Sequence, residues 1–510
     1  MNQAIFAQLM YQTSAKYATE TLGATRVAVV GAADGGAAGG EVDVAVGVGA
    51  KNFLLPLFLL LCTICGCASL VPRRTRKHRE KAAVLERDSI VYRTYVDILR
   101  RELVCAMGCT EPIALAYCAA AARAALGALP DRITVEASGN IIKNVKSVVV
   151  PNTGGRRGIA AAAAIGVLGG DENAELQVIS RVSEDAKAKL GAYLEQTPVE
   201  ILPLPSDCLL DMIVTVRHGD SYAKVRIANE HTNIVLIERD GEVLAQKDSH
   251  AAPEEQNVPD YSLLTVSDIY DFACTCELDD VRAILDRQIE MNTAIAEEGL
   301  RRDYGANIGK VLLKTSDNLR TRAKAYAAAG SDARMNGCEL PVVICSGSGN
   351  QGLTASLPVI VYAEALGAEQ DKLYRALLIS NLITLHEKTG IGRLSAYCGA
   401  VSAGAGAGAG IAYLHGGNER DIAHTIVNAL AISSGIVCDG AKSSCAAKIA
   451  TAVETGIFGY EMYQNGQQFY AGDGLVVKGV ENSIRNFGRL ARVGMRETDQ
   501  EIIRMMTEHS

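Results

Sequence analysis

Apolar and polar positions recur with two different periods, which divide the chain into helix-forming and strand-forming parts. Residues 88–103 have apolar side chains at helical spacing with charges between them, and 113–128 is rich in Ala, so both are predicted helices. Between 131 and 244, short runs rich in β-branched residues predominate, which predicts strands at 133–137, 145–150, 213–217, 222–228 and 233–239. From Val266 onward, helical patterns alternate with Gly-rich turns.

The order of these elements predicts an α+β fold, with a mainly helical C-terminal bundle and a smaller mixed α/β-sheet domain inserted after the first helices. The expected parts are an atypical N-terminal extension (1–92), the first helices (93–130), an α+β domain (131–250), a linker (251–265) and a helical domain (266–505). Within the helical domain, 403–410 alternates Ala and Gly. Such repetition also occurs in silk-like strands, but the flanking residues favour a buried helix that packs through small side chains.

Residues 1–92 differ in composition from the rest of the chain. The segment 52–72 carries no charged residue and is long enough to span a bilayer as a helix, and the basic run 73–79 follows it directly. The segment is interpreted as a membrane anchor, as a signal segment, or as upstream sequence translated from a misassigned start. A signal segment is disfavoured because it would begin far from the N-terminus. With an anchor, the positive-inside rule keeps the following residues in the cytoplasm, and a misassigned start gives the same location.

The composition favours a soluble, acidic enzyme. The 510-residue chain has 49 Gly, no Trp and 7 Phe, which suits helices whose backbones approach closely. Its net charge of -8 leaves no basic face outside one short run, which argues against binding to nucleic acid. Its 14 cysteines do not form the dense, evenly spaced framework of a small disulfide-rich domain. We therefore expect reduced thiols in a cytoplasmic protein, with some of them acting as ligands or catalytic groups.

Cys109 comes just before the Ala-rich helix predicted at 113–128. Thr110 is the expected N-cap of that helix, which places the Cys109 thiol at the positive end of the helix dipole. A thiol in that position has a lowered pKa and can act as a nucleophile or a general base. The alternative is a buried cysteine that only precedes a capped helix.

Three Gly-containing polar turns are candidate anion sites, because successive backbone N–H groups in such turns can bind a carboxylate. They are the turns at 138–140, 152–157 and 345–352. Their candidate substrate-binding residues are Ser138, Asn140, Thr153, Gly154, Ser348, Gly349, Asn350 and Gln351. Each turn taken alone is equally compatible with an ordinary loop.

Cys398, Cys438 and Cys445 lie in a late segment rich in Gly, Ala and Ser. Any one of them alone is compatible with core packing, but as a set beside Gly turns they form a candidate metal or cluster site. On a straight helix Cys438 and Cys445 would be about 10 Å apart along the axis, but Asp439 and Gly440 break the helix between them. Only three ligands are evident, and an iron with one open position would be a Lewis acid for a substrate.

Taken together, four motifs resemble the alpha chains of iron–sulfur L-serine dehydratases and, within them, the L-cysteine desulfidase branch. The motifs are 107–112, 138–144, 346–352, and Cys398 with 438–445. The resemblance covers roughly 92–505 and leaves the N-terminal extension without a counterpart. It implies a [4Fe-4S] cluster held by Cys398, Cys438 and Cys445, with Cys109 as the proton-accepting base. It also makes 93–130 the first catalytic helices and the helical domain the catalytic bundle.

The activity that the resemblance implies is β-elimination of L-cysteine to pyruvate, ammonia and hydrogen sulfide, with L-serine dehydration at the same site as the alternative. The part of the chain after Cys445 has no cysteine that could cover the cluster, so the site is expected to be open at rest. A pyridoxal-phosphate eliminase is a second class, suggested by 348–352, although strands and helices do not alternate after Val266. A membrane-anchored iron–sulfur sensor is a third. The expected partner is a small amino acid, and association into a homo-oligomer is left open.

Overall fold

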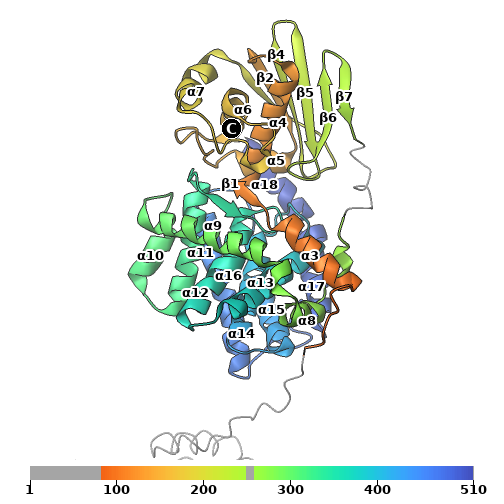
Figure 1. The fold of residues 1–510 in the computed structure, drawn as a ribbon, viewed down its shortest axis with the longest axis vertical. Helices are drawn as coiled ribbons and strands as arrows, with labels where there is room; N and C mark the ends of the chain where they lie inside the picture. The colour runs from red at the N-terminus through yellow and green to blue at the C-terminus, as the bar shows by residue number, and fades with distance from the viewer. Residues whose placement is uncertain (1–81, 248–257, 509–510) are drawn as a thin grey trace, which may run out of the picture. The chain divides into compact units, whose positions relative to one another are not determined.

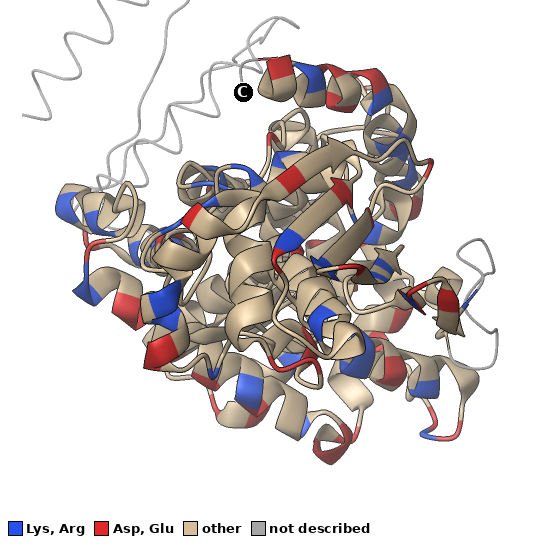
Figure 2. Cartoon of the chain, turned by 90° about the horizontal axis from the view of Figure 1, so that it is seen from above, with Lys and Arg blue, Asp and Glu red and all other residues tan. Residues whose placement is uncertain are grey.

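The computed structural model of the chain describes residues 82–247 and 258–508 (Figure 1). The segment 52–72, on which the anchor and misassigned-start interpretations depend, lies outside these residues. Within the described ranges, none of the helices combines the length and the apolar character that crossing a membrane requires. Figure 2 shows Lys and Arg interspersed with Asp and Glu over the outer elements.

The first elements are α3 (Ile90–Glu102), β1 (Cys105–Met107) and α4 (Thr110–Leu126). Helix α4 is almost wholly buried, because its Ala side chains allow α6 (Gly158–Gly169) to pack closely against it. A Cβ added to Gly166 of α6 would lie 2.3 Å from the Ala116 carbonyl oxygen, so this contact requires glycine. The N-cap of α4 is Cys109 rather than the predicted Thr110, because Cys109 has the extended backbone and Thr110 is already helical.

A six-stranded sheet follows, with the order β3-β2-β4-β5-β6-β7. Its strands are β2 (Arg132–Ala137), β3 (Val199–Pro203), β4 (Asp211–His218), β5 (Ser221–Ala228), β6 (Ile234–Arg239) and β7 (Glu242–Gln246). Strand β2 pairs parallel with β3 and antiparallel with β4, and the other pairs are antiparallel. Helix α4 packs against β4, β5 and β6, and α7 (Glu184–Gln196) packs beside α6. The alternation within β2 buries Ile133, Val135 and Ala137 on the core face.

The strand predicted at 145–150 is wrong. Helix α5 (Gly139–Val145) occupies the start of that run, and the remainder is a turn with isolated bridges from Val149 to Arg157 and Asn336. Val148, Val149 and Val150 are buried in this turn, so their apolar character reflects burial rather than strand pairing.

The rest of the chain is a bundle of helices, as predicted. Its elements are α8 (Val266–Thr275), α9 (Arg282–Arg301), α10 (Ile308–Thr315), α11 (Leu319–Met335), α12 (Gly349–Ala365), α13 (Gln370–Ile391), α14 (Gly399–Leu414), α15 (Glu419–Ser433), α16 (Cys445–Gln464), α17 (Val480–Arg489) and α18 (Arg496–Glu508). One short strand, β8 (Pro341–Val343), pairs antiparallel with β1 and so connects the first helices to the bundle. The chain therefore has the expected α+β fold, mostly helical, while the exact domain boundaries stay predictions.

Helix α14 contains the Ala–Gly repeat and lies at the centre of the bundle between α13 and α16. Cβ atoms added to Gly404 and Gly408 would lie 2.3 and 2.4 Å from carbonyl oxygens of α16. Those added to Gly406 and Gly410 would lie 2.5 and 2.8 Å from carbonyl oxygens of α13. The alternating glycines thus let two neighbouring helices approach α14 on two faces, which confirms the predicted buried helix.

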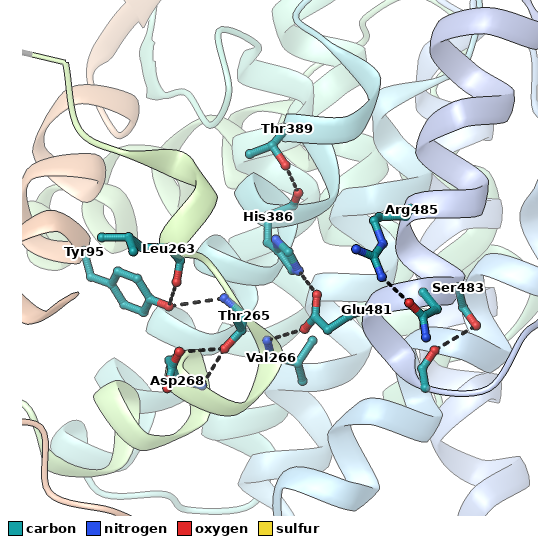
Figure 3. A network of polar contacts seen from close by, with 12 residues as sticks. Tyr95, Leu263, Thr265, Val266, Asp268, His386, Thr389, Glu481, Ser483 and Arg485 are labelled. Carbon is teal, nitrogen blue, oxygen red and sulfur yellow. Dashed lines mark hydrogen bonds and ion pairs between the residues drawn. The ribbon is translucent and has the colours of Figure 1, made fainter. Parts of the chain in front are cut away.

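Figure 3 shows the polar contacts that attach the end of the predicted linker, near Leu263 and Thr265, to the helical bundle. Tyr95 Oη donates to the Leu263 carbonyl at 2.8 Å, and the Val266 N–H donates to Glu481 Oε1 at 2.8 Å. The other carboxylate oxygen of Glu481 lies 2.7 Å from Nε2 of His386. These contacts join α3, α8, α13 and α17. The segment that leads into the bundle is therefore bound to α3 through Tyr95 and to α17 through Glu481.

Candidate active site

One pocket of about 100 Å³ brings together residues from distant parts of the chain. Cys109 lies in its lining together with Cys398, Cys438 and Cys445. Of the candidate substrate-binding residues, Ser348, Asn350 and Gln351 also line it. The fold therefore places the proposed base and the three proposed cluster ligands around one small space.

Backbone pairing sets Cys398 and Cys438 side by side. Tyr397 and Val437 form an isolated antiparallel bridge, flanked by hydrogen bonds from Cys398 N to Ile436 O at 3.1 Å and from Cys438 N to Ala396 O at 2.7 Å. Cys398 is the N-cap of α14, which positions its thiol where this helix begins.

Cys445 is the first residue of α16, and its Sγ lies 3.6 Å from the Gly440 carbonyl oxygen. Gly440 has φ +88, and a Cβ on it would lie 2.3 Å from the Lys143 carbonyl oxygen. Only glycine fits this position, so Gly440 lets the loop between Cys438 and Cys445 turn back against α5.

The same loop is held by Asp439 and two lysines. Lys442 Nζ lies 2.5 Å from Asp439 Oδ1, and Lys448 Nζ contacts the same oxygen while donating to the Val437 carbonyl at 2.6 Å. Burial alone raises the pKa of Asp439, but the two ammonium groups outweigh it and lower the pKa to about 2. The carboxylate therefore stays charged and fixes the loop at physiological pH.

The setting of Cys398 and Cys445 favours the protonated form of their thiols. Burial raises the pKa of Cys398 to about 12, and the neighbouring Cys438 and Cys445 add to the effect. Burial likewise raises the pKa of Cys445. Metal binding requires thiolates, so loading this site must release protons.

Across residues 82–247 and 258–508, no group of three His, Cys, Asp or Glu side chains has the geometry to hold a single metal ion. A cluster of several iron atoms spaces its thiolate ligands more widely than one ion does. Three thiols that line one pocket, two of them beside the bridge at Tyr397 and Val437 and the third at the start of α16, fit such a cluster.

Cys109 is buried at the start of α4, and its Sγ donates to Glu111 Oε2 at 3.1 Å. Burial and the adjacent Glu111 carboxylate raise the pKa of Cys109 well above its usual value, and Arg334 only partly offsets them. The predicted lowering of this pKa is therefore wrong, because burial and a neighbouring negative charge outweigh the helix dipole.

Glu111 is one of the pocket residues that the sequence did not identify as part of the site. Its Oε1 accepts a hydrogen bond from Asn144 Nδ2 at 3.1 Å and lies 3.9 Å from Nε2 of His231. Burial raises its pKa, but His231 and the Cys109 thiol outweigh that effect and lower the pKa to about 2. An acid in the first turn of a helix usually needs no other explanation, so only the contacts identify Glu111 as part of the site.

Buried cations also line the pocket. Arg334 is 2% exposed, and its Nη1 donates to Asn350 Oδ1 at 3.1 Å while its Nε has no hydrogen-bond partner among the described residues. Lys388 is buried as well, which lowers its pKa to about 8 despite the nearby thiols of Cys398 and Cys438. Burying positive charge is costly unless an anion accompanies it, so these cations make the pocket suited to a group with negative charge.

The other five candidate substrate-binding residues lie outside the pocket lining, and their role stays a prediction. Ser138 Oγ donates to the Leu209 carbonyl at 2.8 Å, and Thr153 Oγ1 donates to the Val150 carbonyl at 2.6 Å. Asn140 contacts Asp499, and Gly154 has φ +66 in its turn. Gly349 lies against Arg334, whose Nε would be 2.2 Å from an added Cβ.

Comparison with known proteins shows the family of the chain. The family model described as serine dehydratase alpha chain matches residues 173–504, and the chain belongs to that family. A UPF0597 protein of Desulfitobacterium hafniense is 58% identical over 423 residues, which is 83% of this chain and 98% of the relative. UPF0597 proteins of Lachnoclostridium phytofermentans and Treponema denticola are 51% and 44% identical over 82% of this chain, with 100% and 99% of those relatives covered. The resemblance seen in the sequence motifs is thereby confirmed.

Proposed function

We propose that this chain is an iron–sulfur lyase that eliminates the β-substituent of a small L-amino acid, with L-cysteine as the first substrate. The overall change is L-cysteine and water to pyruvate, ammonia and hydrogen sulfide. The observation that carries the proposal is the convergence of Cys109 and three further thiols on one small pocket lined by buried cations.

Cys398, Cys438 and Cys445 are the residues that would hold a [4Fe-4S] cluster. When bound, such a cluster supplies a Lewis-acidic iron to the leaving group of the amino acid. The loop contacts of Asp439 and the bridge at Tyr397 support this assignment, because both fix the backbone that carries the ligands.

Arg334, oriented by Asn350, is suited to bind the substrate carboxylate, since it is buried and its Nε is unpartnered among the described residues. Glu111 is the carboxylate in the pocket lining, and it is suited to bind the substrate ammonium group. Pairing with that ammonium would reduce the negative field that raises the pKa of Cys109. Cys109, held beside Glu111, would then release its own proton to solvent and, as a thiolate, accept the proton from Cα.

L-serine is the second candidate substrate, because the matching family model is described as serine dehydratase alpha chain. Its hydroxyl would leave from the position that the thiol of L-cysteine takes, and the contacts to the carboxylate and ammonium groups would be the same. A pyridoxal-phosphate eliminase has less support, because its fold would require strands and helices to alternate. In the described part of the bundle, the helices α8 to α18 are accompanied by one short strand, β8. A non-catalytic iron–sulfur sensor is the remaining alternative.

The test is to purify the full chain without oxygen, reconstitute it with iron and sulfide, and offer L-cysteine and L-serine. We expect pyruvate with sulfide from L-cysteine, and loss of activity after exposure to oxygen or in Cys398→Ala. Cys208→Ala is the matched control, since Cys208 lies outside the pocket. Full activity in Cys398→Ala or Cys438→Ala would refute the cluster assignment, and a lysine adduct trapped by borohydride would favour pyridoxal phosphate.

Cys109→Ala separates the base from the cluster ligands. We expect the visible absorbance of the cluster to persist while turnover falls by at least ~100-fold, since a positioned base contributes 10²–10⁴-fold. A variant that loses its absorbance together with its activity would show that Cys109 acts on the cluster instead.

A further inference from the structure

The C-terminal helix α18 is fastened to α5 by a buried polar contact. Asp499 Oδ1 lies 2.5 Å from Lys143 Nζ, and Asp499 Oδ2 accepts a hydrogen bond from Asn140 Nδ2 at 2.9 Å. All three residues are buried. Ile503 of α18 also packs closely on α5, because a Cβ added to Gly139 would lie 2.9 Å from its Cγ2. Figure 1 shows α5 and α18 side by side.

Helix α5 in turn contacts both halves of the candidate active site. On one side, Asn144 Nδ2 donates to Glu111, which accepts the hydrogen bond from the Cys109 thiol. On the other side, the Lys143 carbonyl oxygen packs against Gly440, in the loop between two of the late cysteines. Lys143 and Asn144 themselves line the pocket. The placement of α5 therefore affects both Cys109 and the loop that carries the late cysteines.

We propose that Asp499 is a positioning residue of this site, which holds α5 so that Asn144 keeps Glu111 and Cys109 in place and Lys143 supports the loop at Gly440. Asp499 does not line the pocket, so it acts through α5. The side chain of Lys143 is 1% exposed, and without the carboxylate its ammonium group would be buried with no counter-charge. Lys143 must then move toward water, and α5 moves with it.

The first test is the alkylation rate of Cys109 in the full chain as purified, measured at fixed pH by iodoacetamide labelling and peptide mass spectrometry. Asp499→Asn keeps the size of the side chain and removes its charge. We expect Cys109 to react at least fivefold faster in this variant, because Glu111 no longer holds the thiol in its buried position. Glu501→Gln is the matched control on the same helix, since Glu501 pairs with Arg504 at the surface, and it should react as the wild type does.

The second test is a double-mutant cycle with Lys143→Met, which removes the buried positive charge. The double variant should react closer to the wild-type rate than Asp499→Asn alone, because no uncompensated charge remains. Additive effects of the two substitutions would overturn the proposed coupling between Asp499 and Lys143.

The turnover measurement rests on the function proposed above, whereas the alkylation measurement does not. With L-cysteine, Asp499→Asn should lower kcat at least tenfold and change KM less than kcat, because Cys109 and Glu111 are displaced while the contacts to the substrate carboxylate remain. A wild-type chain that turns over no amino acid would count against the proposed lyase and leave the alkylation result valid.

An alkylation rate equal to that of the wild type in a folded Asp499→Asn variant would overturn the positioning role. Should that variant not fold, Asp499→Glu decides the question, because it keeps the charge, and we expect intermediate alkylation and kcat.

Discussion

Glu111 is where the polar contacts around Cys109 converge. It receives hydrogen bonds from Cys109 and Asn144 and lies opposite His231, all within a buried setting. A buried carboxylate is stable only when its neighbours compensate for lost water. Here they do so strongly enough that its pKa falls to about 2.

The lowered pKa of Glu111 makes the stability of the chain depend on pH. A carboxyl group whose pKa is lower in the folded than in the unfolded chain stabilises the fold at any pH above its unfolded pKa. This stabilisation is lost as the pH falls through the folded pKa. The change from 4.5 to about 2 corresponds to about 3 kcal/mol at neutral pH, most of it lost between pH 5 and 2. We expect the midpoint of urea unfolding to fall less over this range in Glu111→Gln than in the wild type.

The control for this measurement is Glu195→Gln, at an exposed position on α7. Its pH profile should follow that of the wild type. Equal slopes for Glu111→Gln and the wild type would mean that Glu111 is not held as a carboxylate in the folded chain.

At the scale of elements, the contact of α14 with α13 and α16 sets the positions of two proposed ligands. Cys398 caps α14 and Cys445 begins α16, so the spacing between these helices also sets the spacing between the two thiols. The Ala–Gly repeat thus contributes to the site although none of its residues lines the pocket.

Gly408→Ala should destabilise the chain by about 1–3 kcal/mol, because overpacking in a close helix contact forces the backbones apart. The added Cβ would lie 2.4 Å from the Gly456 carbonyl oxygen. Thermal unfolding measures the loss of stability, and the iron bound per chain measures the effect on the site. The unfolding temperature and the iron content should both decrease.

Gly191→Ala on α7 is the matched control. Its Cβ would meet the movable end of the Arg156 side chain at 2.9 Å, so we expect unchanged or slightly higher stability. A Gly408→Ala variant as stable as this control would show that the close approach of α14 and α16 can relax freely.

At the scale of the whole molecule, the site depends on contacts between segments that are far apart in the chain. Lys143 and Asp499 are 356 residues apart, and Cys105 of β1 pairs with Val343 of β8, which is 238 residues later in the chain. The packing unit that contains all of these contacts begins at Arg79. The residues that line the pocket all lie within it.

A chain shortened to begin at Arg79 should therefore unfold at the same temperature as the full chain and show the same kcat/KM. Side-by-side thermal unfolding and turnover measurements check this, and a large loss in either would show that the preceding residues support the fold.

Flotation of the full chain with phosphatidylcholine vesicles tests the anchor interpretation of 52–72. A full chain that stays in the soluble fraction would contradict the anchor.

The sequence by itself determined the α+β class, most helices, the strands β2, β4, β5 and β6, and the buried character of the Ala–Gly helix. These features depend on local periodicity and on turn residues, which are visible along the chain. Cys109, Cys398, Cys438 and Cys445 were also identified there, through motifs shared with a family. The exceptions at this level include the run 145–150 and the N-cap at Cys109, where burial and backbone conformation overrode local preference. The strands β1, β3 and β8 were also not predicted.

Only the tertiary structure decided which side chains surround Cys109. Glu111, Arg334 and Lys388 gave no signal of their own, because single charged residues are common in helices and become unusual only when buried around one pocket. The direction of the pKa shift at Cys109 also depended on burial, which sequence spacing does not report. The contact of Asp499 with α5 required the whole chain to fold, since its partners lie more than 350 residues away.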